Sequence, residues 1–384
     1  MDVRGVPARR VGQWRPSQRQ YSLRPGPRWG ADRAPARRPA GPGPRGSLGG
    51  AAVRGTTGIP CSLLRARSTG KRISVRKLKQ RIGQVGLGSI GRIYARHLLD
   101  AAEEVSVFDL DRARVDAVAR DGATGARSAR DLAAASEVIV VSLPNPPAVE
   151  QAFLADDGIL AGAAPGTVVL DLSTVSPVTS RRMYAAAAEH GVAYLDTPVS
   201  GGAPMNGGVE GAAARTITFM VGGDADAFEK AKPVMDALGK VYLHIGPSGS
   251  GSTIKLISNM MSGVYTLVTA EAFALGAAVG LSPERLLEVF QHTDAKSYFM
   301  TDYLVPRLLR GDLDPGFSVA LQLKDHRLAA DLGDEHRVTL SLNEQAIHLY
   351  ELMVLQGHAE RDVTEALPFF AEQAGQSLPV AASG

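Results

Sequence analysis

The stretch that decides the fold covers residues 82–102 and reads IGQVGLGSIGRIYARHLLDAA. A short apolar strand pattern runs directly into Gly86, Gly88 and Gly91, and a helical pattern follows. G-x-G-x-x-G between a strand and a helix is the signature of a dinucleotide-binding turn. Gly86 would make the tight turn, Gly88 would let a pyrophosphate approach, and Gly91 would let helix and strand pack closely. The phosphates would then lie at the helix N-terminus, where free N–H groups favour negative charge.

A second predicted strand, residues 104–109 (EVSVFD), ends in Asp109, 23 residues after Gly86. A carboxylate there can accept hydrogen bonds from both ribose hydroxyls and would repel a 2′-phosphate, so it favours NAD. The alternative is an ordinary turn residue at a strand end. Arg112 and Arg114 follow closely, so NADP is not excluded.

Strand patterns continue at residues 137–142 and 167–172 and begin again at 193, which predicts an α/β Rossmann-type domain. Ligands of open parallel sheets bind outside the carboxyl ends of the strands. Candidate ligand-facing residues at such ends are Leu143, Pro144, Thr174 and Ser200.

Residues 196–220, DTPVSGGAPMNGGVEGAAARTITFM, contain two Gly-Gly pairs. Turn chemistry alone can account for clustered glycines. Bare backbone can also bring main-chain N–H groups against a ligand. The position of this loop at the ligand side of the sheet favours the second interpretation.

After residue 246 the pattern becomes helical, which predicts an all-α domain over residues 247–384. One long, largely apolar helix carries Lys255 and Asn259 on one face, four residues apart. A lysine in such a helix needs a partner or a task, although it can also extend to solvent. Ser282-Pro283-Glu284 is typical of a helix start, and a further amphipathic helix is expected to open at residues 324–326.

Composition separates the first 80 residues from the rest. They hold 19 of the 42 Lys and Arg but 2 of the 39 acidic residues, so the remaining chain is acidic. This Arg-, Pro- and Gly-rich segment lacks apolar periodicity, so we expect residues 1–80 to be a disordered basic tail. It could bind nucleic acid, act as a transit peptide, or be a non-functional extension; the last interpretation is favoured. The Rossmann domain is expected over residues 81–246.

Composition also limits the class of protein. Cys61 is the single cysteine, which rules out an internal disulfide framework and fits a reducing, cytoplasmic location. The eight histidines show no metal-ligand spacing, so no structural metal is expected. No run of about 18 apolar residues without charge is present, so no membrane span is expected.

Several motifs in order resemble the β-hydroxyacid dehydrogenase family, which includes 3-hydroxyisobutyrate dehydrogenase. They extend over residues 81–375, and together they are far more specific than any one alone. They are GLGSIG at 86–91, Leu143-Pro144, DLST at 171–174, DTPVSGG at 196–202, GSGSTIKLISN at 249–259 and Lys324-Asp325.

The resemblance implies a Rossmann domain followed by a helical domain, with the active site between them. Lys255 would be the catalytic lysine and Asn259 would position the lysine or the substrate. The other implied roles are carboxylate binding by Ser200, Gly201 and Gly202, and cofactor binding by Gly86, Leu87, Gly88, Ser89, Ile90, Gly91, Asp109, Leu143, Pro144, Thr174 and Lys324.

Two features depart from the family pattern. Ile90 stands where Met is usual, and the glycine-rich loop is about six residues longer, so Asn206-Gly207-Gly208 could replace Ser200-Gly201-Gly202. The resemblance predicts an NAD-dependent dehydrogenase of a short 3-hydroxy acid that forms a homo-oligomer through its helical domain. The alternatives are an NADPH-dependent semialdehyde or imine reductase, and a non-catalytic dinucleotide-binding protein with a basic tail. Retention of Lys255 argues against the imine reductase and the non-catalytic protein.

Overall fold

The computed structural model describes residues 77–201 and 208–378. The chain divides into two units, Met1–Lys71 and Arg72–Gly384, and every described residue belongs to the second. Most of the predicted tail, residues 1–76, therefore lies outside the described residues. Residues 78–80 do not belong to a tail, because the first strand begins at Leu78, four residues before the predicted start.

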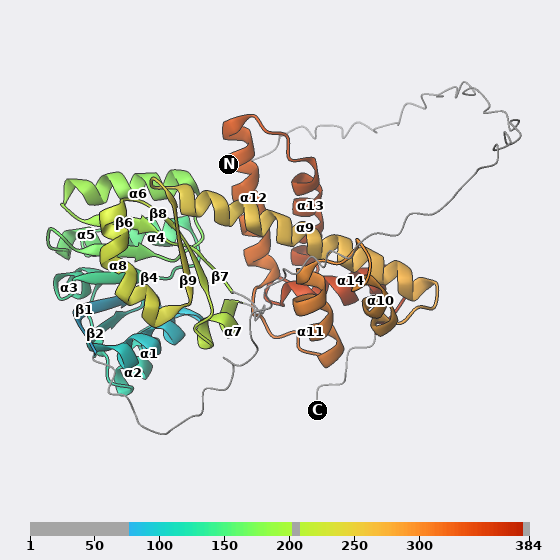
Figure 1. Cartoon of the computed structure of the whole chain (residues 1–384), viewed down its shortest axis with the longest axis horizontal. Coiled ribbons are helices and arrows are strands. Elements are labelled where there is room, and N and C mark those ends of the chain that lie inside the picture. The colour runs from blue at the N-terminus through green and yellow to red at the C-terminus, as the bar shows by residue number, and fades with distance from the viewer. Residues whose placement is uncertain (1–76, 202–207, 379–384) are drawn as a thin grey trace, which may run out of the picture. The chain divides into compact units, whose positions relative to one another are not determined.

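The first half of the described chain forms a Rossmann-type sheet (Figure 1). The strand order is β3-β2-β1-β4-β5-β6-β8-β7, with β9 paired to β8. The sheet is parallel through β6 and then reverses, because β8 pairs antiparallel with β6 and β7. The strands are β1 (Leu78–Val85), β2 (Ala102–Phe108), β3 (Thr124–Gly125), β4 (Val138–Val141), β5 (Val168–Asp171), β6 (Ala193–Asp196), β7 (Val199–Ser200), β8 (Thr218–Gly222) and β9 (Val241–Gly246).

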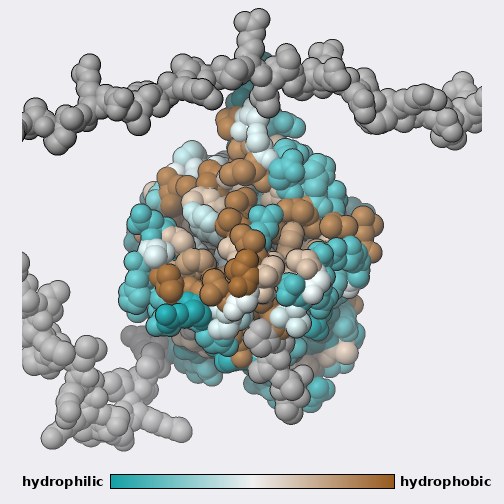
Figure 2. Space-filling model, turned by 90° about the vertical axis from the view of Figure 1, so that its right-hand side faces the viewer, coloured by the Kyte–Doolittle hydropathy of each residue, from teal (hydrophilic) through white to brown (hydrophobic). Residues whose placement is uncertain are grey.

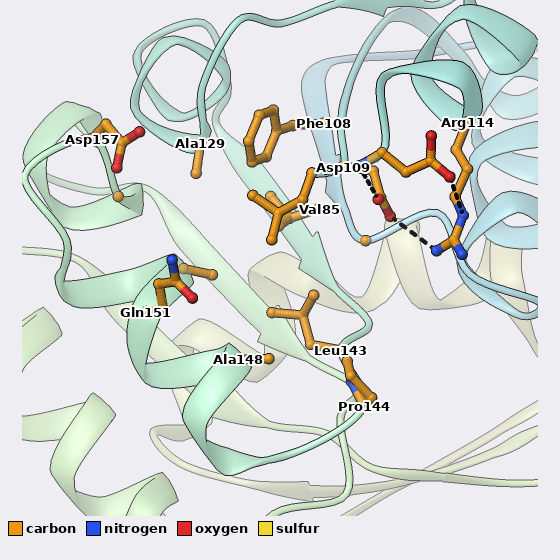
Figure 3. Close-up of a pocket in the computed structure, with 15 residues that line it drawn as sticks. Val85, Phe108, Asp109, Arg114, Ala129, Leu143, Pro144, Ala148, Gln151 and Asp157 are labelled. Carbon is orange, nitrogen blue, oxygen red and sulfur yellow. Dashed lines mark hydrogen bonds and ion pairs between the residues drawn. The ribbon is translucent and has the colours of Figure 1, made fainter.

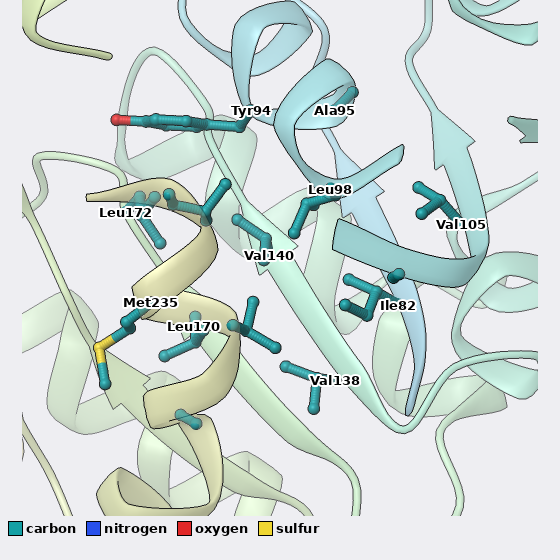
Figure 4. Packing of buried hydrophobic residues seen from close by; sticks show 14 of the residues in the cluster. Ile82, Tyr94, Ala95, Leu98, Val105, Val138, Val140, Leu170, Leu172 and Met235 are labelled. Atoms are coloured by element: carbon teal, nitrogen blue, oxygen red, sulfur yellow. The ribbon is translucent and has the colours of Figure 1, made fainter. Parts of the chain in front are cut away.

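Helices cover both faces of this sheet, and two apolar clusters fill the spaces beneath them. Because the central strands are buried on both sides, they are continuous runs of aliphatic residues, as parallel strands require. Figure 4 shows Val138, Val140 and Leu170 packed beneath the helices that carry Leu98 and Met235. One face carries α1 (Gly91–Ala101), α2 (Arg112–Arg120), α7 (Gly208–Ala213) and α8 (Ala225–Leu238); the other carries α3 (Ala129–Ala134), α4 (Pro146–Leu154), α5 (Ile159–Gly162) and α6 (Pro177–Glu189).

The second half is helical, as the sequence predicts, and has its own apolar cluster. The long α9 (Ser250–Ala278) is its central helix and contacts α12, α13 and α14. The remaining elements are α10 (Pro283–Phe290), the π-helical turn η2 (Met300–Leu304), α11 (Val305–Arg310), α12 (Val319–His336), α13 (Ser341–Leu355), the 3-10 turn η3 (Val363–Glu365) and α14 (Ala366–Gln373).

Two predicted helix starts have different outcomes. Ser282 caps α10, since its side chain accepts from the backbone N–H of Arg285, and this prediction is confirmed. The predicted start at Lys324 is wrong: α12 begins at Val319, because Ser318 supplies the N-cap by accepting from Leu321 N–H. Lys324 therefore lies inside the helix, where its backbone is fixed.

The two halves are joined at the start of α9. Asp196, at the end of β6, accepts from the N–H groups of Gly249 at 2.8 Å and Ser252 at 2.9 Å. A buried carboxylate thus caps a helix N-terminus that would otherwise leave its N–H groups unsatisfied. Within the described ranges α9 is the one helix long and apolar enough to cross a membrane. Its contacts with β8, α12 and α14 make it a core helix of this fold.

Candidate active site

The fingerprint turn has the geometry that its three glycines were expected to provide. Gly86 has a φ of 86°, in the region that favours glycine, and a side chain there would collide with the carbonyl oxygen of Ser142. A side chain at Gly91 would collide with the carbonyl oxygen of Gly86, so this glycine permits close contact of α1 with the turn. Gly88 faces open space, with nothing within 4 Å of a side-chain position. The three glycines thus turn the chain, pack the helix and leave one approach open.

The N-terminus of α1 offers free hydrogen-bond donors beside this opening. The N–H groups of Ser89, Ile90 and Gly91 have no hydrogen-bond acceptor among the described residues, and Ile90 provides no side-chain cap. Arg92 lines a hollow with Gly88 and so adds positive charge. Free N–H groups and positive charge at a helix start suit a pyrophosphate.

Asp109 follows β2 and is tied to the fingerprint turn. Its carboxylate accepts from Leu87 N–H at 2.7 Å and from Asp111 N–H at 2.8 Å. Arg114 lies 3.7 Å from the same carboxylate. These bonds hold Asp109 at the mouth of a cavity of about 390 Å³, shown in Figure 3.

That cavity has the character of an adenosine pocket. Its lining is mainly apolar, with Asp109 on one side and with Gln151 and Asp157 on the other (Figure 3). Gly86, Leu143 and Pro144, all predicted to bind cofactor, line it as well. An apolar slot with a carboxylate at one side fits a base and its ribose. The chain's own residues therefore fit a dinucleotide.

A buried carboxylate that sequence reasoning did not assign holds the next part of the site. Asp171 ends β5 and accepts from Ser173 N–H at 3.0 Å and Tyr194 O–H at 2.9 Å. Burial raises the pKa of Asp171 to about 6, against the effect of these hydrogen bonds. Ser173 Oγ in turn accepts from Leu143 N–H at 2.9 Å. Asp171 thus fixes the segments that carry Leu143 and Thr174. The one sequence feature that could have indicated this role is the position of Asp171 at the end of a buried strand.

Lys324 links the helical half to the Rossmann half. Its Nζ donates to the carbonyl oxygen of Thr174 at 2.8 Å and lies 2.8 Å from Asp325 Oδ1. Two residues predicted to lie on the cofactor side are therefore brought together, although they are 150 positions apart. The lysine contacts the main chain at the carboxyl end of β5, where a ligand of the sheet would lie.

Asp325 also holds Asn259. The Asn259 side-chain amide donates to Asp325 Oδ2 at 2.5 Å, and Gln322 donates to the Asn259 carbonyl at 3.0 Å. Asp325 is fully buried and Asn259 is nearly so. One carboxylate on α12 therefore orients both Asn259 and Lys324, a role that the sequence motif did not reveal.

Lys255 lies one turn before Asn259 on α9 and has no hydrogen-bond or ion-pair partner among the described residues. The pKa of Lys255 is lowered to about 8, chiefly by burial; the negative charge of Asp325 opposes this shift and the positive charge of Lys324 adds to it. An amine with that pKa is partly neutral near physiological pH. It can therefore both accept and return a proton.

The predicted substrate loop is described only at its edges. Ser200 ends β7 and is exposed, while Gly201 accepts from the hydroxyl of Thr216 at 3.4 Å. Gly202 lies outside the described residues, as does most of the alternative Asn206-Gly207-Gly208 set. No hydrogen bond joins Ser200 or Gly201 to Lys255 in the described part of the chain, so the carboxylate-binding role stays a prediction.

Known families match both halves. Residues 81–246 match the NAD-binding domain of 6-phosphogluconate dehydrogenase, and residues 249–370 match the NAD-binding domain of NADP-dependent 3-hydroxyisobutyrate dehydrogenase. No group of three or more His, Cys, Asp or Glu that could hold a metal occurs within residues 77–201 and 208–378.

Individual relatives agree with these matches. The chain is 40% identical over 303 residues to an NAD-dependent L-serine dehydrogenase of Pseudomonas aeruginosa, covering 77% of this chain and 100% of the relative. It is 36% identical to a 2-(hydroxymethyl)glutarate dehydrogenase of Eubacterium barkeri, covering 78% and 97%. The solved structure of Mycobacterium tuberculosis 3-hydroxyisobutyrate dehydrogenase with L-serine superposes with a TM-score of 0.68 at 31% identity, covering 76% and 98%.

A G-x-G-x-x-G turn, a carboxylate at the end of β2 and a lysine on a central helix thus occur in a chain whose relatives include dehydrogenases named for L-serine, 2-(hydroxymethyl)glutarate and 3-hydroxyisobutyrate. The chain belongs to the β-hydroxyacid dehydrogenase family. Within that family it is an NAD(P)-dependent oxidoreductase of 3-hydroxy acids.

Proposed function

We propose that the protein oxidises the primary alcohol of a short 2-substituted 3-hydroxypropanoate to its semialdehyde, with Lys255 as general acid and base. The observation that carries this proposal is the position of Lys255 on α9, one turn before Asn259, whose side-chain amide Asp325 holds. Burial also lowers the pKa of Lys255, to about 8. An ordinary lysine is charged almost completely at neutral pH and could not accept the hydroxyl proton.

The names of the relatives support this substrate class. L-serine, 3-hydroxyisobutyrate and 2-(hydroxymethyl)glutarate each carry a hydroxymethyl group on the carbon beside a carboxylate. They differ in the other substituent of that carbon, which is an amino, a methyl or a carboxyethyl group. The shared part is therefore HOCH₂–CH–COO⁻, and we propose that this chain recognises it.

The proton path follows from the chain's own residues. Neutral Lys255 takes the proton of the substrate hydroxyl, and the C–H bond of the same carbon breaks as the C=O bond forms. A bound NAD would supply the hydride acceptor, and the fingerprint turn and Asp109 would hold it. Asn259, held by Asp325, orients the reacting oxygen, and Lys324 keeps the segment of Thr174 in place. In the reverse direction protonated Lys255 donates to the carbonyl oxygen of the semialdehyde.

We propose that the substrate carboxylate binds at Ser200, Gly201 and Gly202. Backbone N–H groups of a glycine-rich segment can surround an anion without a side chain in the way. The hydroxyl of Ser200 is exposed and adds a donor.

The test is a panel of acids with NAD and NADP, measured as kcat/KM. We expect turnover of L-serine, 3-hydroxyisobutyrate or 2-(hydroxymethyl)glutarate, and none of lactate, whose hydroxyl lies on the carbon beside the carboxylate. 3-Hydroxybutyrate, a secondary alcohol, should be poor. Preference for lactate would contradict the proposal.

Three further expectations complete it. We propose that the protein acts in the cytoplasm and that the helical domain assembles it into a homo-oligomer. We also propose that a tail precedes β1, which begins at Leu78, that the Rossmann domain extends from β1 to residue 246, and that the helical domain covers residues 247–384. Limited proteolysis of the full chain would test these boundaries.

A further inference from the structure

The short helix α7 follows the predicted substrate loop in the chain and contacts β7, which precedes that loop and ends in Ser200. A side chain at Gly211 of α7 would collide with the carbonyl oxygen of Gly201. The same carbonyl accepts from the hydroxyl of Thr216 at 3.4 Å. The backbone of Gly201, one of the residues proposed to bind the substrate carboxylate, therefore packs directly on α7.

The start of α7 is tied to the helical half by a buried cation. Arg307 of α11 donates from Nη1 to Oε1 of Glu210 at 2.9 Å. Figure 2 shows hydrophilic residues over the surface of the helical end, where an arginine would ordinarily lie. Arg307 is instead 4% exposed. A guanidinium removed from water needs anionic partners, and Glu210 is the one that the Rossmann half supplies among the described residues.

The other partners of Arg307 hold it in place. Its Nη2 donates to Asp312 Oδ1 at 3.0 Å, and its Nε lies 3.8 Å from Asp362 Oδ1. Asp362 is fully buried and also accepts from Tyr303 O–H at 2.9 Å. Arg307 therefore offers α7 a fixed donor, and it stays paired when Glu210 is removed.

The end of α7 is tied to α1, the helix that starts at the fingerprint turn. The Ala212 carbonyl accepts from His97 Nε2 at 2.9 Å, so Nε2 carries the imidazole proton. His97 Nδ1 then accepts from Arg215 Nε at 3.0 Å, and Arg215 Nη2 donates to Asp100 at 2.9 Å. Burial lowers the pKa of His97, which favours this neutral form of the ring.

Arg215 makes these bonds from a backbone conformation that favours glycine. Its φ is 55°, and among the described residues other than glycine only Arg337 shares a positive φ. An L side chain is strained in this region. The bonds to His97 and Asp100 are therefore what the arginine adds over a glycine at this position.

We propose that Arg307 and Arg215 are positioning residues for the substrate. Their bonds, here called the α7 clamp, hold α7 at both ends, and α7 holds the backbone of Gly201 where the carboxylate of the acid binds. One tie runs to the helical half and the other to α1, so the clamp fixes the carboxylate relative to both Lys255 and the dinucleotide. This inference rests on the carboxylate site proposed above.

A looser α7 should weaken binding of the acid without changing the chemical step. The carboxylate is bound equally in the ground state and in the transition state, because it does not react. Loss of such uniform binding raises KM and leaves kcat unchanged. A loss of folded protein acts differently, since it lowers the apparent kcat and leaves KM unchanged.

The test uses the full chain with Glu210→Ala, with Arg215→Gly and with both changes. Glycine suits the left-handed backbone at position 215. Alanine suits the helix at position 210, where the side chain is exposed. KM is measured for the acid of the panel that the wild type oxidises best. We expect it to rise about tenfold in the double variant, as for the loss of a charge-assisted hydrogen bond, with kcat and the Kd for NADH unchanged.

Two matched controls separate the clamp from the substitutions themselves. Arg337→Gly changes a residue with nearly the same φ, 56°, at the end of α12. Glu288→Ala removes an exposed glutamate whose arginine partner lies on the same helix, α10. Neither residue makes a hydrogen bond or an ion pair to α7 in the described part of the chain, so both controls should keep the wild-type KM. Hydrogen exchange of residues 209–217 should be faster in the double variant than in the wild type and the controls.

Each outcome decides the inference. Unchanged hydrogen exchange would show that the two ties do not hold α7. Faster exchange with an unchanged KM would show that α7 does not position the acid, and a rise in the Kd for NADH as large as the rise in KM would assign the clamp to the cofactor. Each of these results overturns the inference and leaves the proposed function intact. A wild type that oxidises none of the panel acids would overturn both.

Discussion

The two ligand-facing regions of the molecule are built by different means. At the fingerprint turn the backbone forms the candidate binding surface. Glycines leave the main chain uncovered, and free N–H groups remain at the start of α1. Around Lys255 the candidate site is formed by side chains. Asp325 contacts both Asn259 and Lys324, and burial is the main cause of the lowered pKa of Lys255. Changes at the turn should therefore alter cofactor binding or stability, and changes at the lysine should alter turnover and its pH dependence.

The largest effect should come from Lys255→Met. Met has a similar length and no charge, so NADH binding should persist while kcat falls by about 10²–10⁴-fold, the usual range for loss of a general acid–base group. Steady-state kinetics and NADH fluorescence titration measure the two quantities. Near-wild-type kcat would transfer the proton role to Lys324 or to a water.

Stability offers an independent check on this variant. The folded pKa of Lys255, about 8, lies below its ordinary value of 10.5, so the folded state binds fewer protons between these values. The wild type should therefore gain stability as pH rises from about 8 to 10.5. Lys255→Met should lack this gain. At pH 7 its free energy of unfolding should exceed that of the wild type by at most about 3.4 kcal/mol, at about 1.36 kcal/mol per pKa unit, and its melting temperature should be higher.

Two glycines of the turn form a matched pair. Gly88 faces open space, so Gly88→Ala should leave the melting temperature unchanged but weaken NADH binding by about 10–100-fold, the loss of one or two charge-assisted hydrogen bonds. Gly91→Ala would meet the backbone of Gly86 and should lower stability by about 1–3 kcal/mol or more. Equal effects of the two changes on stability would contradict the separation of roles.

Cofactor choice should depend on Asp109. We expect the wild type to prefer NAD, and Asp109→Ala to lose much of that preference, because the carboxylate that would repel a 2′-phosphate is gone. Arg114, which stays paired with Asp111 at 3.2 Å, would lie beside that phosphate. Values of kcat/KM for NAD and NADP in both proteins test this expectation. A wild-type preference for NADP would refute it.

A smaller effect is expected at Asp325, because it acts through its neighbours. The charged groups that influence Lys255 are Asp325, which raises its pKa, and Lys324, which lowers it. Asp325→Asn should therefore move the Lys255-dependent limb of the kcat–pH profile to lower pH, with a smaller loss of kcat than Lys255→Met. Asp331→Asn, an exposed acid on the same helix, is the control and should leave the limb unmoved.

These regions also differ in what the sequence could predict. The turn was predictable because glycine spacing between a strand and a helix reports backbone geometry directly, and Gly86, Gly88 and Gly91 have the expected environments. The fold of both halves followed from hydrophobic periodicity. Asp325 was quoted in a motif without a role, because its partner Asn259 lies 66 positions away and is brought to it only by tertiary packing.

A predicted helix boundary was wrong where a capping hydrogen bond, rather than the pattern of charged residues, sets the start of the helix. α12 begins at Val319, five residues before the charged triplet 324–326 that had marked its start, because the Ser318 hydroxyl caps the helix. The buried Asp171 and Asp196 were also missed as structural groups. Each ends a strand, and a single sequence does not show that such a carboxylate turns inward to accept N–H and O–H donors.

The smallest effect should follow removal of residues 1–75. Lys77 donates from Nζ to the carbonyl oxygen of Leu99, and β1 pairs with β2 from Leu78 onward, so a chain that starts at Arg76 retains every described contact. We expect its melting temperature and kcat/KM to equal those of the full chain. A chain that starts at Ile82 would lose the first half of β1 and its pairing with β2, so it should be less stable. If removal of residues 1–75 alone lowered stability or turnover, the tail would contribute to the fold, and the composition-based expectation of a dispensable segment would be wrong.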